Sequence, residues 1–569
     1  MKAKRVLSII IVQVVLFCVS LYSQVPLGVE PGAVQHGSRQ VLDHYESTSK
    51  ISVPFTLTSP ISGNTNLNAS AVAPASTTVE MVLLNRVVTD ASDILNSDDI
   101  RGVTSKYEGR QVSISELNGM VADLNDLYSK KGFTMARAVL PPQSVQDGVV
   151  RVRLVEGRIG EVFVQTGTHT HNSYVLNRIP LKTGELIDVN ELQRTLAYFN
   201  ATNDLKLHAE LQPGRAFGTA NVVLQGEGPE DAEVTFFFDN AGRDTIGNYR
   251  GGTMVRFNSL FGNRDPLLVG FLGANGTLSG FGSYSVPLGL HGLRIGGGFD
   301  YNTIEINSGP LESVGIVGHA FDATLRLTSP LVAHSTTTLN GFATAHLKKS
   351  LLQSEGYPLT HTRVRSIEVG ADFQKFDNHG LWYFSNMINT GFHDLGGSNT
   401  FLRYNGTVAR VFTFRNNMRT ILRASGQANA LDPLPPIEQF QIGGVATVRG
   451  YPEGRLIGNN GMNLTGEFNI PMRVGEKDLL GTYLSKRLTL ALFVDHGKVF
   501  DEGFSDSIYD HMTSLTSAGF GVSFNLPMRL TGRVDVGFPL QNRNGISSVG
   551  VNFYLQTTYP FSRMWNRNK

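Results

Sequence analysis

The fold of this chain is constrained most by a dyad repeat of apolar and polar residues between Asp231 and Phe561. Almost the whole span consists of short alternating segments, such as residues 253–258, separated by turns that contain Gly, Asn or Asp. Successive side chains of a strand point to opposite faces, so the repeat predicts a long series of β-strands with two unlike faces.

No segment beyond the N-terminal twenty or so residues supplies the roughly 18 consecutive apolar residues that a membrane helix needs. If the chain crosses a membrane, it must do so as a closed barrel, because backbone polar groups have no other partners in lipid. At about ten residues plus a connection per strand, residues 231–561 allow about sixteen strands. A soluble secreted β-protein, with the apolar faces buried in sandwiches, is the alternative that this pattern leaves open.

A glycine-rich stretch from Gln441 to Gly454 interrupts the repeat and carries Arg449. Its glycines, Gly443, Gly444, Gly450 and Gly454, permit backbone turns that a side chain would forbid. The stretch therefore predicts a folded loop with the arginine at its tip, although an ordinary exposed hairpin would have a similar composition.

Two strands predicted after this loop each carry polar residues on one face. Between Gly461 and Ile470 the polar face consists of Asn463, Thr465, Glu467 and Asn469. In the segment 488–500, Asp495 shares its face with Thr489, Ala491 and Phe493, opposite a row of leucines and Val494. We therefore expect Asp495 on the polar side of its strand.

The loop and the later strand resemble a motif of the TpsB family, the two-partner (type V) secretion transporters that include the haemolysin and filamentous-haemagglutinin secretion and activation proteins. The residues that carry the resemblance are Val448, Arg449, Gly450 and Tyr451 in the loop, and Phe493, Asp495 and Gly497 in the strand. The resemblance implies that the sixth extracellular loop folds back into a barrel, where Arg449 meets Asp495 in the lumen.

Further segments of the same span resemble TpsB barrels. Residues 239–243 with Gly247, and later residues 284–289, resemble the first barrel strands of the family. In TpsB proteins a terminal aromatic residue is the signal that the assembly machinery reads, which implies this role for Phe561. Here the extension 562–569 follows it, and Trp565 is a second candidate for the role.

The N-terminus has the order of a secretory signal peptide over residues 1–23: Lys2, Lys4 and Arg5 precede an apolar run, which is short for a membrane anchor. Cys18, the only cysteine, lies in this segment, so a mature chain without it excludes disulfides and thiolate metal sites. Residues 24–77 are linker-like, with a short helix predicted at about 35–46. The family implies a plug helix there, and a disordered lead-in is the alternative.

Two small α+β units are predicted before the barrel. Residues 78–159 contain a strand, a capping box at Ser113 and Glu116 before an amphipathic helix, and a closing alternating segment over 150–159. Residues 160–228 again place a cap, Asp188, before a helix and two strands. Both units resemble the periplasmic POTRA domains of TpsB transporters, whose sheet edges could hold an extended client; a spacer role is the alternative.

The sequence carries no pattern typical of an enzyme: it has no zincin, nucleophile-elbow or phosphate-loop motif, and we predict no catalytic residue, cofactor or metal. His169 and His171 lie in a polar turn that favours solvation over metal binding. A net charge of +1 gives no electrostatic case for nucleic acid.

These observations predict a mainly β outer-membrane protein: two POTRA domains in the periplasm, then a 16-stranded antiparallel transmembrane β-barrel over 231–561. The resemblance implies that it secretes an unfolded TpsA-type exoprotein, a haemolysin or adhesin. Its other expected partners are outer-membrane lipid and, during biogenesis, the barrel-assembly machinery. The alternative on the same architecture is an insertase that assembles other barrels, although such proteins usually carry more POTRA domains.

Overall fold

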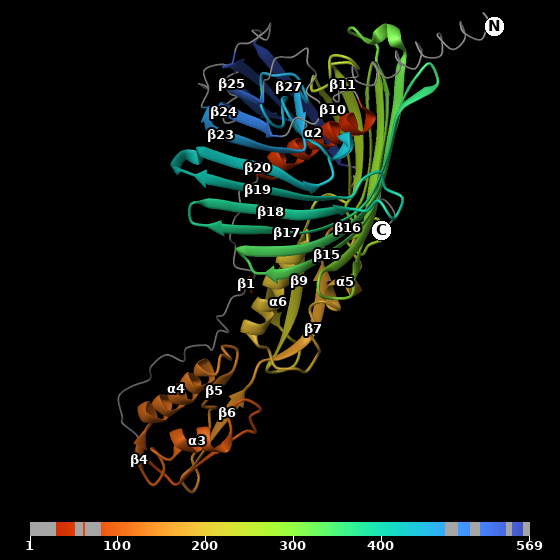
Figure 1. Ribbon diagram of the computed structural model, residues 1–569. Helices are drawn as coiled ribbons and strands as arrows, with labels where there is room; N and C mark the ends of the chain where they lie inside the picture. Colours follow the sequence, from red (N-terminus) through yellow and green to blue (C-terminus); the bar gives the residue numbers. More distant parts are fainter. Residues whose placement is uncertain are drawn as a thin grey trace, which may run out of the picture. The chain divides into compact units, whose positions relative to one another are not determined.

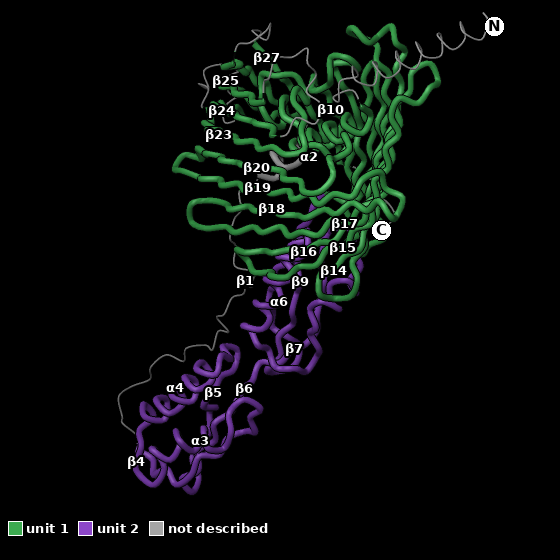
Figure 2. Tube along the Cα trace, viewed as in Figure 1, with its two compact units in different colours: residues 1–55, 230–569 green, residues 56–229 purple. Residues whose placement is uncertain are grey.

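The computed structural model describes residues 30–51, 61–62, 81–472, 487–500, 513–527, 529–541 and 549–560. The chain divides into two compact units, one of residues 1–55 with 230–569 and one of residues 56–229 (Figure 2). The predicted signal peptide, Phe561 and the extension 562–569 lie outside the described residues.

The first part of the smaller unit is an α+β fold. Its elements are β2 (Met81–Leu84), β3 (Arg86–Thr89), α3 (Ser97–Thr104), β4 (Arg110–Ser113), α4 (Ile114–Lys130), β5 (Arg137–Val139) and β6 (Val149–Val155). β6 runs parallel to β3 and antiparallel to β5. The predicted capping box is present, because the Ser113 hydroxyl accepts from the Glu116 amide and the Glu116 carboxylate accepts from the Ser113 amide. It starts α4 so that Leu117, Met120, Leu124 and Tyr128 point into the core.

The second part has its own core. Its elements are β7 (Arg158–Gln165), α5 (Asn172–Leu176), α6 (Val189–Thr202), β8 (Lys206–Pro213) and β9 (Thr219–Glu227), with β1 (Ile61–Ser62) added to the sheet in the order β1-β8-β9-β7. The Asp188 carboxylate caps α6 by accepting from two backbone amides, and Leu192, Leu196 and Phe199 are buried beneath it.

One strand boundary differs from the sequence prediction. We expected a single alternating segment from 150 to 159, but β6 ends at Val155 and Arg158 begins β7, which belongs to the next sheet. The break has a local cause. The Glu156 carboxylate accepts a hydrogen bond from the Asp93 amide at 3.0 Å, and Gly157 packs against the backbone of Met135.

The larger unit contains a closed barrel, in which sixteen strands of the described chain pair antiparallel (Figure 1). They are β10 (Ala232–Asp239), β11 (Arg250–Phe257), β12 (Leu267–Ala274), β13 (Thr277–Leu288), β14 (Leu293–Glu305), β15 (Ile316–Ala333), β16 (Thr337–Ser354), β17 (Tyr357–Asp377), β18 (Gly380–Gly391), β19 (Phe401–Thr413), β20 (Arg419–Leu431), β23 (Asn460–Met472), β24 (Leu488–Phe500), β25 (Ser514–Leu526), β26 (Leu530–Pro539) and β27 (Gly550–Pro560). β27 closes the ring by pairing with β10, with Glu233 opposite Pro560.

The predicted alternation separates the two faces of this barrel. In β24, Leu492 and Val494 are about half exposed, whereas Ala491, Phe493 and Asp495 are buried. The same contrast recurs around the ring, so large apolar side chains cover the outside. Such an outer surface is what lipid requires of a transmembrane barrel.

A helix, α2 (Pro31–Ile51), lies inside the ring of strands (Figure 1). Along one side Val34 packs with Ile304 and Leu352 of β14 and β16, whereas further along the helix His44 meets Arg423 of β20. Contacts with several separate strands of the closed ring place the helix in the lumen. It is longer than the predicted segment 35–46, beginning at Pro31, a residue suited to the first helical turn.

The connection between β20 and β23 also turns into the barrel. It contains a short 3₁₀ helix, η4 (Pro436–Glu438), which contacts α2, and a small hairpin of β21 (Phe440–Ile442) with β22 (Leu456–Gly458). Two further 3₁₀ turns, η2 (Glu312–Val314) and η3 (Arg415–Asn417), lie in other connections. None of the helices in the described ranges is both long enough and apolar enough to span a membrane.

Candidate functional site

The predicted loop is folded against the inner wall of the barrel through its glycines. Gly450 has φ +93° and lies against Gly537 of β26, where an added Cβ would sit 2.9 Å from backbone atoms. A Cβ added at Gly550 of β27 would in turn meet the Cα of Gly450 at 2.5 Å. The loop backbone therefore touches the wall directly, which a side chain at any of these three positions would prevent.

The structure brings Arg449 and Asp495 together. The guanidinium donates from Nε to Asp495 Oδ2 at 2.7 Å and from Nη2 to Oδ1 at 2.9 Å, and the Arg449 amide donates to Oδ2 at 3.2 Å. Asp495 is completely buried, and Arg449 is 5% exposed. A bidentate, charge-assisted pair of this kind fixes the orientation of both groups.

The pair belongs to a larger ionic network that the sequence did not reveal. Arg449 Nη1 donates to Glu467 Oε2 of β23 at 2.5 Å. Arg533 of β26 donates to both oxygens of Glu467, at 3.0 and 2.8 Å, and to Asp535 at 2.8 Å. Two arginines thus face three carboxylates in a site from which most water is excluded. Burial by itself would lower the pKa of the Arg449 guanidinium, but the Asp495 and Glu467 carboxylates raise it above its usual value.

The other predicted residues surround this network. The Phe493 ring lies under the Arg449 guanidinium, 3.6 Å from Cζ to the ring centroid, and adds a cation–π contact. Val448 is fully buried against Gly497, where an added Cβ would meet it at 2.9 Å. The Tyr451 hydroxyl donates to the Thr516 carbonyl at 3.0 Å. The loop is therefore held by ionic, aromatic, apolar and backbone contacts together.

The loop and a neighbouring connection jointly hold α2. Arg243 Nη2 donates to the Gln441 side-chain oxygen at 2.6 Å, and Gln441 Nε2 donates to the Ala33 carbonyl of the helix at 3.0 Å. Elsewhere Arg39 of α2 forms an ion pair with Asp300 of β14 at 3.4 Å. The helix is held by these polar contacts together with separate apolar clusters around Val34, Val41 and Leu42.

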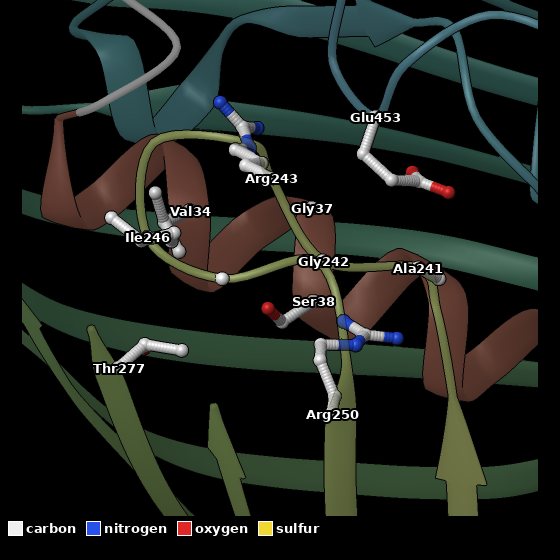
Figure 3. Close-up of a pocket in the computed structure, with 11 residues that line it drawn as sticks. Val34, Gly37, Ser38, Ala241, Gly242, Arg243, Ile246, Arg250, Thr277 and Glu453 are labelled. Carbon is white, nitrogen blue, oxygen red and sulfur yellow. The ribbon is translucent and has the colours of Figure 1, made fainter. Parts of the chain in front are cut away.

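A small cavity of about 20 Å³ lies where α2, the barrel wall and the loop meet (Figure 3). Ser38, Arg243, Arg250 and Glu453 are among its lining residues, and the volume suits a single water molecule. Glu453 Oε1 accepts from the Val445 amide at 2.7 Å, and burial raises the pKa of this carboxyl to about 7. The junction therefore contains charged groups and has room for one water molecule.

A second buried ionic cluster lies in the lumen, where Glu438 pairs with Lys348 at 2.7 Å and with Arg403 at 2.5 Å. The rings of His169 and His171 lie 6.3 Å apart in the smaller unit. Over the described ranges, no three His, Cys, Asp or Glu side chains lie close enough together to hold a metal ion.

Two family descriptions match the chain. "POTRA domain, ShlB-type" matches residues 82–157, and "Haemolysin secretion/activation protein ShlB/FhaC/HecB" matches residues 218–524. Among individual proteins, the chain is 23% identical over 470 residues to the heme/hemopexin transporter protein HuxB of Haemophilus influenzae, which covers 78% of this chain and 81% of HuxB.

Solved structures agree with this fold. CdiB from Escherichia coli aligns with a TM-score of 0.60 at 17% identity, over 93% of this chain and 98% of CdiB. BamA from Haemophilus ducreyi, lacking POTRA domains 1–3, aligns with a TM-score of 0.53 at 12% identity, over 84% of this chain and 100% of that structure. The barrel fold is thus shared with BamA, but the family description that covers most of the barrel is that of secretion proteins. The chain belongs to the ShlB/FhaC/HecB family, the TpsB transporters, which are secretion pores of the bacterial outer membrane with POTRA domains in the periplasm.

Proposed function

We propose that this transporter receives one TpsA-type exoprotein, a haemolysin or adhesin, as an unfolded chain in the periplasm and passes it through the barrel lumen. The observation that carries the proposal is a closed barrel whose interior is filled by two segments, α2 and the loop 441–454, that are not part of the wall. Displacing such segments opens a path without breaking the ring of strands. Folding of the client outside would bias the direction, and no catalytic step is required.

We further propose that residues 158–228 form a second POTRA domain. This unit has the same strand topology as the matched POTRA domain. In the matched domain β6 runs parallel to β3 and antiparallel to β5. In residues 158–228 β9 likewise runs parallel to β7 and antiparallel to β8. In each unit two helices lie in sequence between those strands. This shared arrangement supports the count of two that the sequence predicts.

Client recognition would use the edges of these sheets. An edge strand offers unpaired N–H and C=O groups, to which an extended polypeptide can add as a further strand. In residues 158–228 the edge strand β8 already pairs with one added strand, because β1 lies parallel to it at Ala209 and Glu210. An unfolded client is the type of partner that this mode of binding suits.

Within the barrel, we assign α2 the role of a plug and Arg449 that of fixing the loop. The ionic network holds the loop against β23, β24 and β26, so that the loop returns to one position after each export event. The apolar outer face would contact outer-membrane lipid, and the barrel-assembly machinery would insert the protein, reading Phe561 or Trp565.

Photo-crosslinking in the native host tests this function. A photoreactive residue at Gln212, exposed on β8, is compared with one at Glu185, which is exposed in a loop of the same unit. The proposal predicts that Gln212 alone captures one large secreted protein, identified by mass spectrometry. Capture of many different outer-membrane barrels would favour the insertase, and equal or absent capture at both positions would contradict client docking at this edge.

A further inference from the structure

We infer that His44 makes closure of the lumen sensitive to protons: α2 stays docked while this imidazole is neutral and is released when the imidazole becomes protonated. The inference rests on the proposed role of α2 as the plug. It concerns the helix alone and requires no client.

The first argument is the hydrogen bond that His44 accepts. Arg423 Nη1 lies 3.4 Å from His44 Nδ1. A guanidinium has only donors and stays charged at any physiological pH, so Nδ1 must be an unprotonated acceptor in this contact. Protonation of His44 would place an N–H against an N–H, and a second positive charge against the first.

Two carboxylates, Asp495 and Glu467, act electrostatically on Arg423, but both are bonded to other arginines. Arg423 Nη2 donates to the Ala446 carbonyl of the loop at 3.0 Å, and within the described chain Arg423 has no ion pair at 4.0 Å or less. Both acceptors that face Arg423 in these contacts are neutral groups. Because Asp495 and Glu467 are bonded to Arg449 and Arg533, the charge of Arg423 still opposes a protonated His44.

The wider surroundings act in the same direction. Besides Arg423 of β20, Arg449 of the loop and Arg533 of β26 face His44, and Glu467 of β23 is the carboxylate that opposes them. Burial and these arginines hold the pKa of His44 well below 6.5. Because Glu467 is already bonded to both Arg449 and Arg533, it is not available to pair with the imidazolium.

A second histidine of the helix, His36, has similar neighbours. Arg403, Lys348 and Arg243 face it, and the opposing carboxylate, Glu438, is occupied by Lys348 at 2.7 Å and Arg403 at 2.5 Å. Burial and these cations lower the pKa of His36 to about 4. His36 would therefore add to the effect of His44.

The direction of the pH dependence follows from these shifts. The pKa of each histidine is lower in the docked helix than in a released, hydrated one, so docking is stable above about 6.5 and weakens as pH falls below that value. For one histidine that stays neutral when docked, lowering pH from about 7.5 to about 5.5 favours release about tenfold.

Conductance of the full chain in planar bilayers, without client, tests the inference. We expect the open fraction of the wild-type channel to rise at least about tenfold between pH about 7.5 and about 5.5. His44→Gln keeps an oxygen acceptor for Arg423 but cannot titrate. The change in its open fraction between the two pH values should therefore be about tenfold smaller than that of the wild type. His171→Gln, at an exposed position of the smaller unit, serves as the matched control and should respond as the wild type does.

Two results would overturn the inference: a wild-type open fraction that does not change with pH, or a response in His44→Gln equal to that of the wild type. Heat-modifiable electrophoretic mobility would establish that each variant has folded. A variant without residues 30–51 should be open at both pH values. If that deletion stays closed, the plug assignment fails, and the inference fails with it; if it opens while the wild type ignores pH, only the inference fails.

Discussion

Removing the Arg449 side chain should release the loop while leaving the barrel intact. Arg449→Ala deletes three side-chain hydrogen bonds to carboxylates, at 2.7, 2.9 and 2.5 Å, and the contact with the Phe493 ring. It also leaves Asp495, Glu467 and Asp535 with Arg533 as the remaining cation of the network. Loss of one partner from a buried ion pair costs about 3–5 kcal/mol.

This cost should appear in the opening of the loop. Since about 1.4 kcal/mol corresponds to a factor of ten, amides of residues 443–451 should exchange with deuterium on the order of a hundred- to thousandfold faster in Arg449→Ala. Amides of β16, which lies outside the network, should keep wild-type rates. In Arg449→Lys the loop amides should exchange at a rate between those of the wild type and Arg449→Ala, because an ammonium cannot form the bidentate pair.

A double-mutant cycle supplies the decisive comparison. Arg449→Ala and Asp495→Ala each leave a buried charge behind, whereas the double variant removes both, so the two costs should not add. We expect a coupling energy of at least about 2 kcal/mol from the exchange rates. A coupling below about 0.5 kcal/mol, with the barrel folded in all variants, would refute the account of the loop as fixed by this pair.

Three further predictions concern other parts of the molecule. Gly450→Ala should displace the loop and speed exchange of its amides, whereas Gly356→Ala, also at positive φ but with open space around it, should not; equal exchange in the two variants would contradict the close approach to Gly537 and Gly550. Burial raises the pKa of Glu453 to about 7, so docking of the loop that carries it should weaken as pH rises from about 4.5 to about 7. Glu453→Gln stays neutral at every pH. The loop amides of this variant should therefore exchange more slowly than those of the wild type at pH about 8, and at the same rate at pH about 4. Ser113→Ala should destabilise the POTRA domain of residues 82–157 by about 1 kcal/mol, seen as faster exchange in α4 of the full chain, and unchanged exchange there would count against the capping box.

Much of the barrel could be predicted from the sequence because alternation is a local property. Alternate residues of β24 face opposite sides of the strand, and this alternation is sufficient to place Asp495 inside and Val494 outside. The number of strands came from the length of the span together with the resemblance, since spacing alone leaves it open. Two ends were misjudged, those of α2 and β6, because lumen contacts extend the helix and a carboxylate interaction ends the strand.

The partners within the site were harder to predict than its faces. Glu467 was expected on a polar face, but its contact with Arg449 and Arg533 depends on how β23, β24 and β26 are arranged around the ring. The contacts of α2 with Gln441 and Arg423 join residues about four hundred positions apart, and no periodicity in a single sequence encodes such a pairing. The glycines were the available signal, since Gly450, Gly537 and Gly550 mark where the loop meets the wall.

The central claim is that a polypeptide travels through the lumen, and crosslinking from inside the barrel tests it most directly. Asn389 and Ile388 are neighbours on β18, the first buried inside the barrel and the second about half exposed on the outer face. With a photoreactive residue at one or the other position during active export, the account predicts that position 389 captures the secreted partner and position 388 does not. Capture from position 388 alone, or from neither position while secretion continues, would contradict passage through the lumen.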